Sequence, residues 1–188
     1  AGPVAVQGFP IANLGTIDAR SQIILSFGKA PWKLRADLSG AMTRVGNATL
    51  VTVAGTGIRF AGNVTMGGGA PLLVERATLA GSRLRLAASG RRLPDGTASL
   101  TGRGNHADYG DFTVDAQLAG DGPRAVLVFA EPLPAARLTN VRIALAPIAD
   151  GFRLDTQGGS PLGPFDGVIN LYAPPGGPTR LVVDRMTV

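Results

Sequence analysis

The chain has 188 residues, of which 45% are hydrophobic and only 16% are charged, and its formal net charge at pH 7 is +5. This composition excludes intrinsic disorder, which requires low hydrophobicity together with high net charge. The sequence holds no cysteine, so disulfides and thiolate metal sites are excluded, and its longest uninterrupted apolar run, residues 125–130, is too short to be a membrane-spanning helix.

Turn-forming sequences recur along the chain, and no stretch between them has a convincing helical period. They are GKAP at Gly28, GTG at Gly55, GGGAP at Gly67, LPDG at Leu93, GDGP at Gly120, EPLP at Glu131, ADG at Ala149, GGSPLGP at Gly158 and PPGGP at Pro174. Short runs rich in Val, Ile, Leu and Thr separate them. This rhythm predicts an all-β chain of about a dozen strands joined by hairpins, with no helix.

Within the runs, apolar and polar residues alternate. The period of two is clearest in residues 33–38, 58–66, 111–118, 141–145, 152–155 and 180–184. Such alternation is typical of antiparallel strands with one dry face and one solvated face.

Residues 82–104 contain five arginines and predict a hairpin around the turn Pro94-Asp95-Gly96. Their even-numbered residues then share the dry face: Leu84, Leu86, Ala88, Ala98 and Leu100. Their odd-numbered residues, Arg83, Arg85, Arg91 and Arg103 among them, point the other way. We therefore interpret the arginines as a solvated sheet face that discourages aggregation, and not as a nucleic-acid-binding arm, which would combine clustered cations with aromatic residues.

A dozen strands would offer roughly 40 apolar positions, covering on the order of 1,300 Å² at the spacings of a β-sheet. Soluble monomers rarely expose more than a few hundred Å² of apolar surface. Three architectures cover such a face: a β-sandwich, a closed barrel, or a curled, taco-like antiparallel sheet whose apolar groove meets a ligand. Aromatic residues make up only 5% of the chain, and Ala and Gly are abundant, which is an argument for the curled sheet because small side chains leave room for an acyl chain. A GC-rich coding bias explains the same composition, so the sandwich and the barrel stay open.

The period of two names the residues that would line such a groove. They are Leu34, Leu38, Ile58, Phe60, Val64, Leu84, Leu86, Leu100, Phe112, Val114, Leu118, Val141, Ile143, Leu145, Phe152, Leu154, Leu181 and Val183.

Strands of the type L-x-A-x-L-x-G, and above all the segment LDTQGGSPLGPFDGVINLYAPPGGPTRLVVDRMTV (residues 154–188), resemble the long β region of TamB and YdbH-like proteins of the AsmA-like superfamily. The resemblance covers nearly the whole chain, and it rests on the recurring pattern of strand and turn residues and not on a catalytic motif. It implies a lengthwise-folded β-sheet with a hydrophobic groove in the periplasm, and a full-length protein anchored in the inner membrane.

The same resemblance implies that the protein conducts phospholipid between the inner and outer membranes, with acyl chains as its ligand and a TamA-like outer-membrane protein as a partner. It supplies no catalytic residues. Residues 1–188 would then be a single all-β segment excised from a longer repetitive protein. The alternatives are a structural or adhesive surface domain, built as a sandwich or like an autotransporter, and a scaffold for the assembly of outer-membrane strands.

No pattern in the sequence predicts an enzyme, a cofactor or a metal site. His106, the only histidine, stands with Asp108 and Asp111 in NHADYGD, which we interpret as a turn-rich loop. Ser160 in GGSPLG does not fit a nucleophile elbow, and GTGIRFAG lacks the lysine and the spacing of a phosphate-binding loop.

Overall fold

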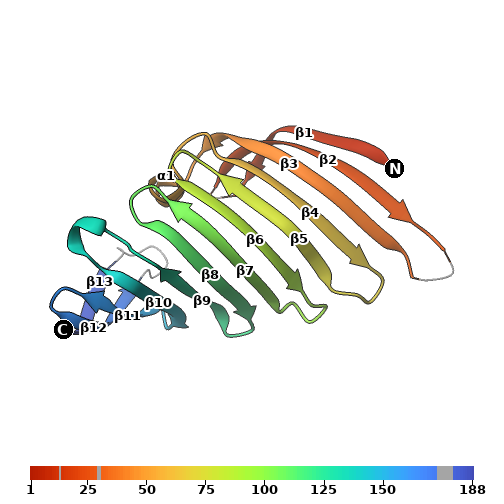
Figure 1. Cartoon of the computed structure of the whole chain (residues 1–188). Coiled ribbons are helices and arrows are strands. Elements are labelled where there is room, and N and C mark those ends of the chain that lie inside the picture. The colour runs from red at the N-terminus through yellow and green to blue at the C-terminus, as the bar shows by residue number, and fades with distance from the viewer. Residues whose placement is uncertain (13, 29–30, 173–179) are drawn as a thin grey trace. The chain divides into compact units, whose positions relative to one another are not determined.

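Thirteen strands follow one another in the computed structural model of the chain, which describes residues 1–12, 14–28, 31–172 and 180–188 (Figure 1). Every described pairing joins strands adjacent in sequence, and every one is antiparallel. β1 and β13 each pair on one side only, so the antiparallel sheet is open. The all-β fold class is confirmed, and the closed barrel is excluded.

The chain divides into two compact units, residues 1–96 and 97–188. The first unit contains β1 (Gly2–Ile11), β2 (Gly15–Ser26), β3 (Lys33–Val45), α1 (Ala48–Ala54), β4 (Arg59–Gly67), β5 (Leu72–Ala80) and β6 (Leu84–Arg92). The second contains β7 (Ala98–His106), β8 (Gly110–Ala119), β9 (Gly122–Phe129), η1 (Pro134–Ala136), β10 (Thr139–Ile148), β11 (Gly151–Ser160), β12 (Gly163–Tyr172) and β13 (Arg180–Thr187).

The turn after β6 forms where the sequence predicts it. The amide of Gly96 donates a hydrogen bond to the carbonyl oxygen of Leu93 at 3.0 Å, and Gly96 has φ +89°, which a residue with a side chain rarely adopts. The GGSPLGP motif also holds a turn, but β11 continues through Gly158 and Gly159 to Ser160, which faces Gly163. Parts of GKAP and all of PPGGP lie outside the described residues.

The prediction of a chain without helices is wrong, because α1 occupies residues 48–54 between β3 and β4. Asn47 caps the helix by accepting a hydrogen bond from the amide of Leu50 at 2.9 Å, and Gly55 follows as its C-cap. The helix is rich in β-branched residues, which have low helix propensity, so its composition resembles that of a strand. Docking against the sheet stabilises it instead.

The structure buries few apolar side chains for its size. The buried apolar residues of the described chain are Ala19, Ala54, Ile58, Phe112, Val141 and Val168. The accessible surface is 12084 Å², whereas a compact monomer of this mass exposes about 8,400 Å² and two separate compact halves would expose about 10,200 Å². The strands therefore lack the second layer that would make one of their faces an ordinary core.

Candidate functional site

The strand register of the first unit gathers apolar side chains on one face of its sheet. One row crosses all six strands, with successive cross-strand partners Val6, Ala19, Gly40, Phe60, Leu79 and Leu86. The next row is Val4, Ser21, Leu38, Gly62, Ala77 and Ala88. Because partners in an antiparallel ladder point to the same side, these rows form one continuous surface. We call it the apolar face of the first unit.

The second unit is built in the same way. One row crosses all seven of its strands through Leu100, Ala116, Ala125, Leu145, Leu154, Ile169 and Val183. A second row runs through Gly102, Val114, Leu127, Ile143, Thr156, Gly167 and Met186. These residues define the apolar face of the second unit, and it extends uncovered to the edge, where Leu181 is 62% and Val183 is 54% exposed.

In the first unit, α1 covers one end of the apolar face. Gly81 comes two residues after Leu79 and so points to the same side, and a Cβ atom on Gly81 would overlap the carbonyl oxygen of Ala54 at the end of the helix. Ala54 is 0% exposed, and Ile58, which follows the helix, is 1% exposed. The amides of Ser82 and Arg83 hold the segment by donating to the carbonyl oxygens of Thr56 and Ala54, at 3.0 and 3.2 Å.

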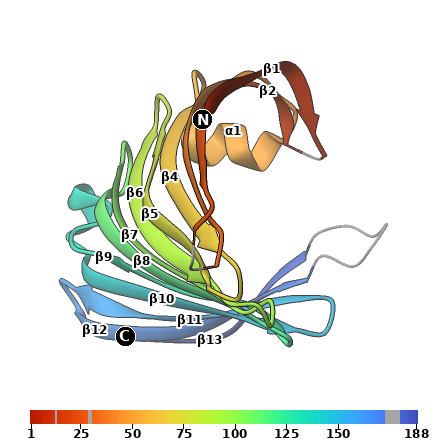
Figure 2. The ribbon, with the colours of Figure 1, turned by 90° about the vertical axis from the view of Figure 1, so that its right-hand side faces the viewer.

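The position of α1 also shows which way the apolar face of this unit points. The helix lies on the inner side of the curve that the strands of the first unit make (Figure 2). Since α1 covers the apolar face, that face lies on the inner side of the curve, and the polar side chains lie on the outer side.

The residues predicted to line a groove lie in these rows or in their continuations, with one exception. Leu34, Leu38, Phe60, Val64, Leu84 and Leu86 are on the apolar face of the first unit, and Leu100, Phe112, Val114, Leu118, Val141, Ile143, Leu145, Phe152, Leu154, Leu181 and Val183 are on that of the second. Ile58 differs because it packs beneath the end of α1 and precedes β4.

Sequence reasoning missed the contributions of five strands: β1, β2, β5, β9 and β12. β9 shows why, since its run AVLVF is apolar on both sides and has no period of two. Its pairing with β8 nevertheless sets Leu127 opposite Val114 and Phe129 opposite Phe112, and sets Val126 and Val128 among polar partners on the other face. The turn sequence GDGP before the short apolar run and the turn sequence EPLP after it were the signal that could have found it.

His106 belongs to an aromatic cluster at one end of the second unit. Its ring stacks on Tyr109 with centroids 4.7 Å apart, and Phe129 contacts both Tyr109 and Phe112, at 6.2 and 5.4 Å. The His106 ring is buried, and its Nδ1 accepts a hydrogen bond from the amide of Asp108 at 3.2 Å. Across the described residues, no group of three or more His, Cys, Asp or Glu side chains is placed to hold a metal ion.

The opposite faces of both units carry most of the charged residues of the strands. In the second unit Arg153 pairs with Asp155 at 2.9 Å, and this carboxylate raises the pKa of the arginine above its ordinary value. Arg124 likewise donates to Asp121, and the pKa of that carboxyl is lowered by the hydrogen bond and by the positive charge. Burial in β6 alternates as predicted, with Arg85 and Arg91 exposed and Leu84 and Leu86 partly covered.

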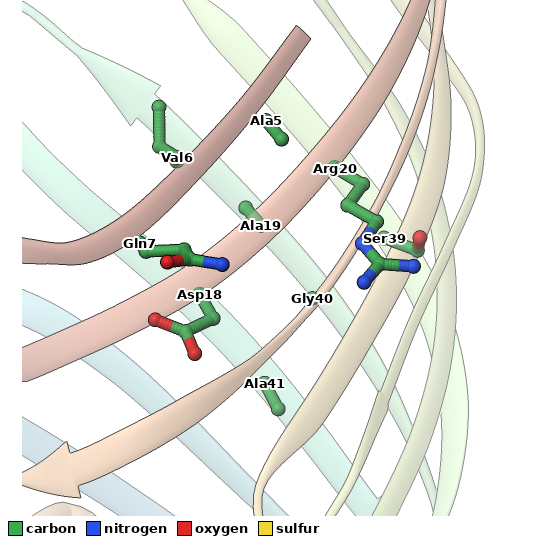
Figure 3. A pocket seen from close by; sticks show the side chains of 9 residues that line it. All are labelled: Ala5, Val6, Gln7, Asp18, Ala19, Arg20, Ser39, Gly40 and Ala41. Atoms are coloured by element: carbon green, nitrogen blue, oxygen red, sulfur yellow. The ribbon is translucent and has the colours of Figure 1, made fainter. Parts of the chain in front are cut away.

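Each unit has a depression in its surface. One of about 240 Å³ is lined by β1, β2 and β3 and includes Val6, Ala19 and Gly40 of the first apolar row; Figure 3 shows the Arg20 side chain extended beside Ser39 at its wall. The other, of about 530 Å³, is lined by Arg103, Asn105, Asp111 and Thr113 together with neighbouring residues of the second unit. None of the helices in the described part of the chain is long and apolar enough to cross a membrane.

These features define a class: an open antiparallel β-sheet protein in which each unit has one apolar face and one charged face. No protein-family model matches the chain, and neither a curated protein nor a solved structure is significantly similar to it.

Proposed function

We propose that the chain is a lipid-binding segment of a bridge-like lipid-transport protein, and that its apolar face carries phospholipid acyl chains. In this proposal the whole protein is of the TamB and AsmA-like type that the sequence resembles. It is anchored in the inner membrane, extends through the periplasm, and conducts phospholipid between the inner and outer membranes in support of outer-membrane biogenesis. A TamA-like outer-membrane protein is its proposed partner, and no catalysis is involved.

The continuity of the apolar rows is the observation that supports this proposal. One row crosses six strands in the first unit and another crosses seven in the second, which at ~4.8 Å per strand corresponds to about 24 Å and about 29 Å of uninterrupted apolar surface. No charged side chain interrupts either row. An acyl chain laid along such a row would be stabilised by ~0.8 kcal/mol for each methylene removed from water.

The small residues on the face favour an elongated apolar ligand. Gly62 and Ala77 lie in the middle of the first unit's rows, where they lower the surface between larger neighbours. A sheet that packs on a second sheet normally fills that space with large side chains, which interdigitate at core density. An exposed apolar surface of small side chains can contact a flexible hydrocarbon chain more closely than it can pack against a rigid second sheet.

Mass spectrometry of lipid extracted from the purified chain tests the proposal directly. The chain is expressed in bacteria, purified without detergent and extracted with organic solvent under denaturing conditions. We expect phospholipid in amounts comparable to the protein, and none from a globular protein purified in parallel. Repeated preparations without phospholipid would contradict acyl-chain binding and leave the adhesive domain or the assembly scaffold as the better explanation.

A further inference from the structure

The charge of the chain is divided unevenly between its two units. Residues 1–96 hold eleven Lys and Arg against four Asp and Glu, a net charge of +7, whereas residues 97–188 hold seven Arg against nine Asp and Glu, a net charge of −2. The whole positive excess of the chain therefore belongs to the first unit. The position of these positive charges within the first unit decides which ligand they can bind.

Six arginines of the first unit lie on the outer, polar side of its sheet. Cross-strand pairing sets Arg20 opposite Ser39, Arg35 opposite Thr65 and Arg76 opposite Asn63. Arg59 and Arg85 both face Ala80, and Arg91 faces Leu73. All six are exposed and come from β2, β3, β4, β5 and β6. We call this surface the basic face: Arg20, Arg35, Arg59, Arg76, Arg85 and Arg91.

Three carboxylates also lie on the basic face, but each accepts a hydrogen bond from an uncharged group. The amide of Gly8 donates to Asp18 Oδ1 at 2.7 Å, the Asn63 side chain donates to Asp37, and the Thr65 hydroxyl donates to Glu75 at 3.3 Å. The ion pair between Arg35 and Asp37 on this face is a long contact of 3.8 Å. Within the described residues, Arg59, Arg76 and Arg85 form no ion pair.

The second unit is arranged in the opposite way. Arg153 pairs with Asp155 at 2.9 Å, Arg185 pairs with Asp166 at 2.7 Å, and Arg124 pairs with Asp121. A fourth arginine, Arg180, lies 5.1 Å from the ring centroid of Tyr172. Three arginines on this face are therefore paired with carboxylates within the chain, so solubility alone does not explain why Arg59, Arg76 and Arg85 form no ion pair in the described part of the first unit.

We propose that the basic face of the first unit binds the surface of a bilayer that contains anionic phospholipid. Guanidinium groups bind phosphate oxygens with paired, directional hydrogen bonds. The six arginines are spread over five strands, roughly 20 Å at ordinary strand spacing, which fits an array of headgroups better than one compact anion. Among the residues that the structure describes, no aromatic side chain lies between these arginines for stacking on bases, which disfavours single-stranded nucleic acid.

The basic face is separate from the apolar face, since the two lie on opposite sides of the same strands. The inference therefore goes beyond acyl-chain binding and does not depend on it. It gives the segment a second contact with lipid, made by charge and not by burial of hydrocarbon. Such a contact would orient the outer side of the first unit towards a membrane surface.

Vesicle flotation with the full chain tests the inference. Vesicles of phosphatidylcholine alone are compared with vesicles in which about a third of the lipid is phosphatidylglycerol, at low and at high salt. We expect binding to the anionic vesicles only, and its loss as salt rises, because surface charges are screened within about 8 Å at physiological ionic strength. The triple variant Arg59→Gln, Arg76→Gln, Arg85→Gln should bind the anionic vesicles with an affinity lowered by a factor of about ten or more, since each cation near an anionic membrane contributes measurably to affinity.

The matched control removes the same number of arginines from the second unit, as Arg124→Gln, Arg153→Gln, Arg185→Gln, and should leave binding within about twofold of the unmodified chain. Equal binding to both kinds of vesicle, no binding to either, or equal loss in the two triple variants would overturn the inference. So would tighter binding to a DNA duplex than to anionic vesicles at equal phosphate concentration. Phospholipid recovered from the purified triple variant reports on the apolar face separately, and it should be unchanged.

Discussion

Gly40 on β3 lies directly against the ring of Phe60, its cross-strand partner on β4, so that a Cβ atom on Gly40 would stand 2.6 Å from Phe60 Cζ. The same Cβ atom would overlap the backbone of Asp18 on β2. We therefore expect Gly40→Ala to force β2, β3 and β4 apart and to lower the free energy of unfolding by about 1–3 kcal/mol. Chemical denaturation measures the change. Gly2→Ala, at a site with nothing within 4 Å, is the control and should cost far less.

The cap of α1 provides a second prediction. Asn47→Ala removes the acceptor for the amide of Leu50 and should destabilise the helix by about 1 kcal/mol. Hydrogen exchange of the amides in residues 48–55 should accelerate, while exchange in the middle of β8 stays the same. Asn47→Ser keeps a capping oxygen and should restore most of the protection. Unchanged exchange in the alanine variant would mean that docking alone holds the helix.

Site-specific photo-crosslinking tests which face meets lipid. Leu86 and Arg85 are neighbours on β6 that point to opposite sides, and Val114 and Thr113 form the same kind of pair on β8. A photoreactive residue at Leu86 or Val114 should capture phospholipid in cells, whereas one at Thr113 should not. Arg85 belongs to the basic face, so labelling there reports on contact with a membrane surface instead. Equal labelling from Val114 and Thr113 would contradict acyl-chain binding by a single face.

A charge placed in the middle of the apolar face should expel lipid without unfolding the chain. Leu38 is 38% exposed in its row, so Leu38→Asp buries no carboxylate deeply and should leave the fold intact. It should lower the phospholipid recovered from the purified protein by about tenfold, because a desolvated carboxylate against an acyl chain is strongly unfavourable. Ser39→Asp, one residue along on the opposite face, is the control and should retain lipid.

The pair Asp121 and Arg124 predicts a local pH response. The arginine lowers the pKa of the Asp121 carboxyl, so any stabilisation from the pair is present above the ordinary aspartate pKa and is lost as pH falls through the lowered value. Arg124→Gln should raise the carboxyl titration midpoint observed by NMR. The two side chains are exposed, so overall stability should hardly change.

Much of the fold could be predicted from sequence because the alternation of apolar and polar residues along a strand shows which residues lie on each of its two faces. The alternation in residues 33–38 and 111–118 reports burial on one side whatever the neighbouring strands are. Strand β9 and helix α1 escaped prediction for a common reason. Their apolar residues face in both directions or are β-branched, so the local pattern does not distinguish a buried strand from a docked helix.

The amino-acid sequence by itself determined that the chain is all-β, that most of its arginines and most of its leucines occupy opposite faces, and that the turn at Pro94-Asp95-Gly96 follows a strand. These properties follow from the side-chain period and from backbone preferences, which act within a few residues. Only the tertiary structure decided that the sheet stays open, that α1 covers one end of an apolar face, and that Asn63, Thr65 and the amide of Gly8 occupy the carboxylates of the first unit. Those features depend on which strands pair and in what register, and they join residues that are far apart in the chain.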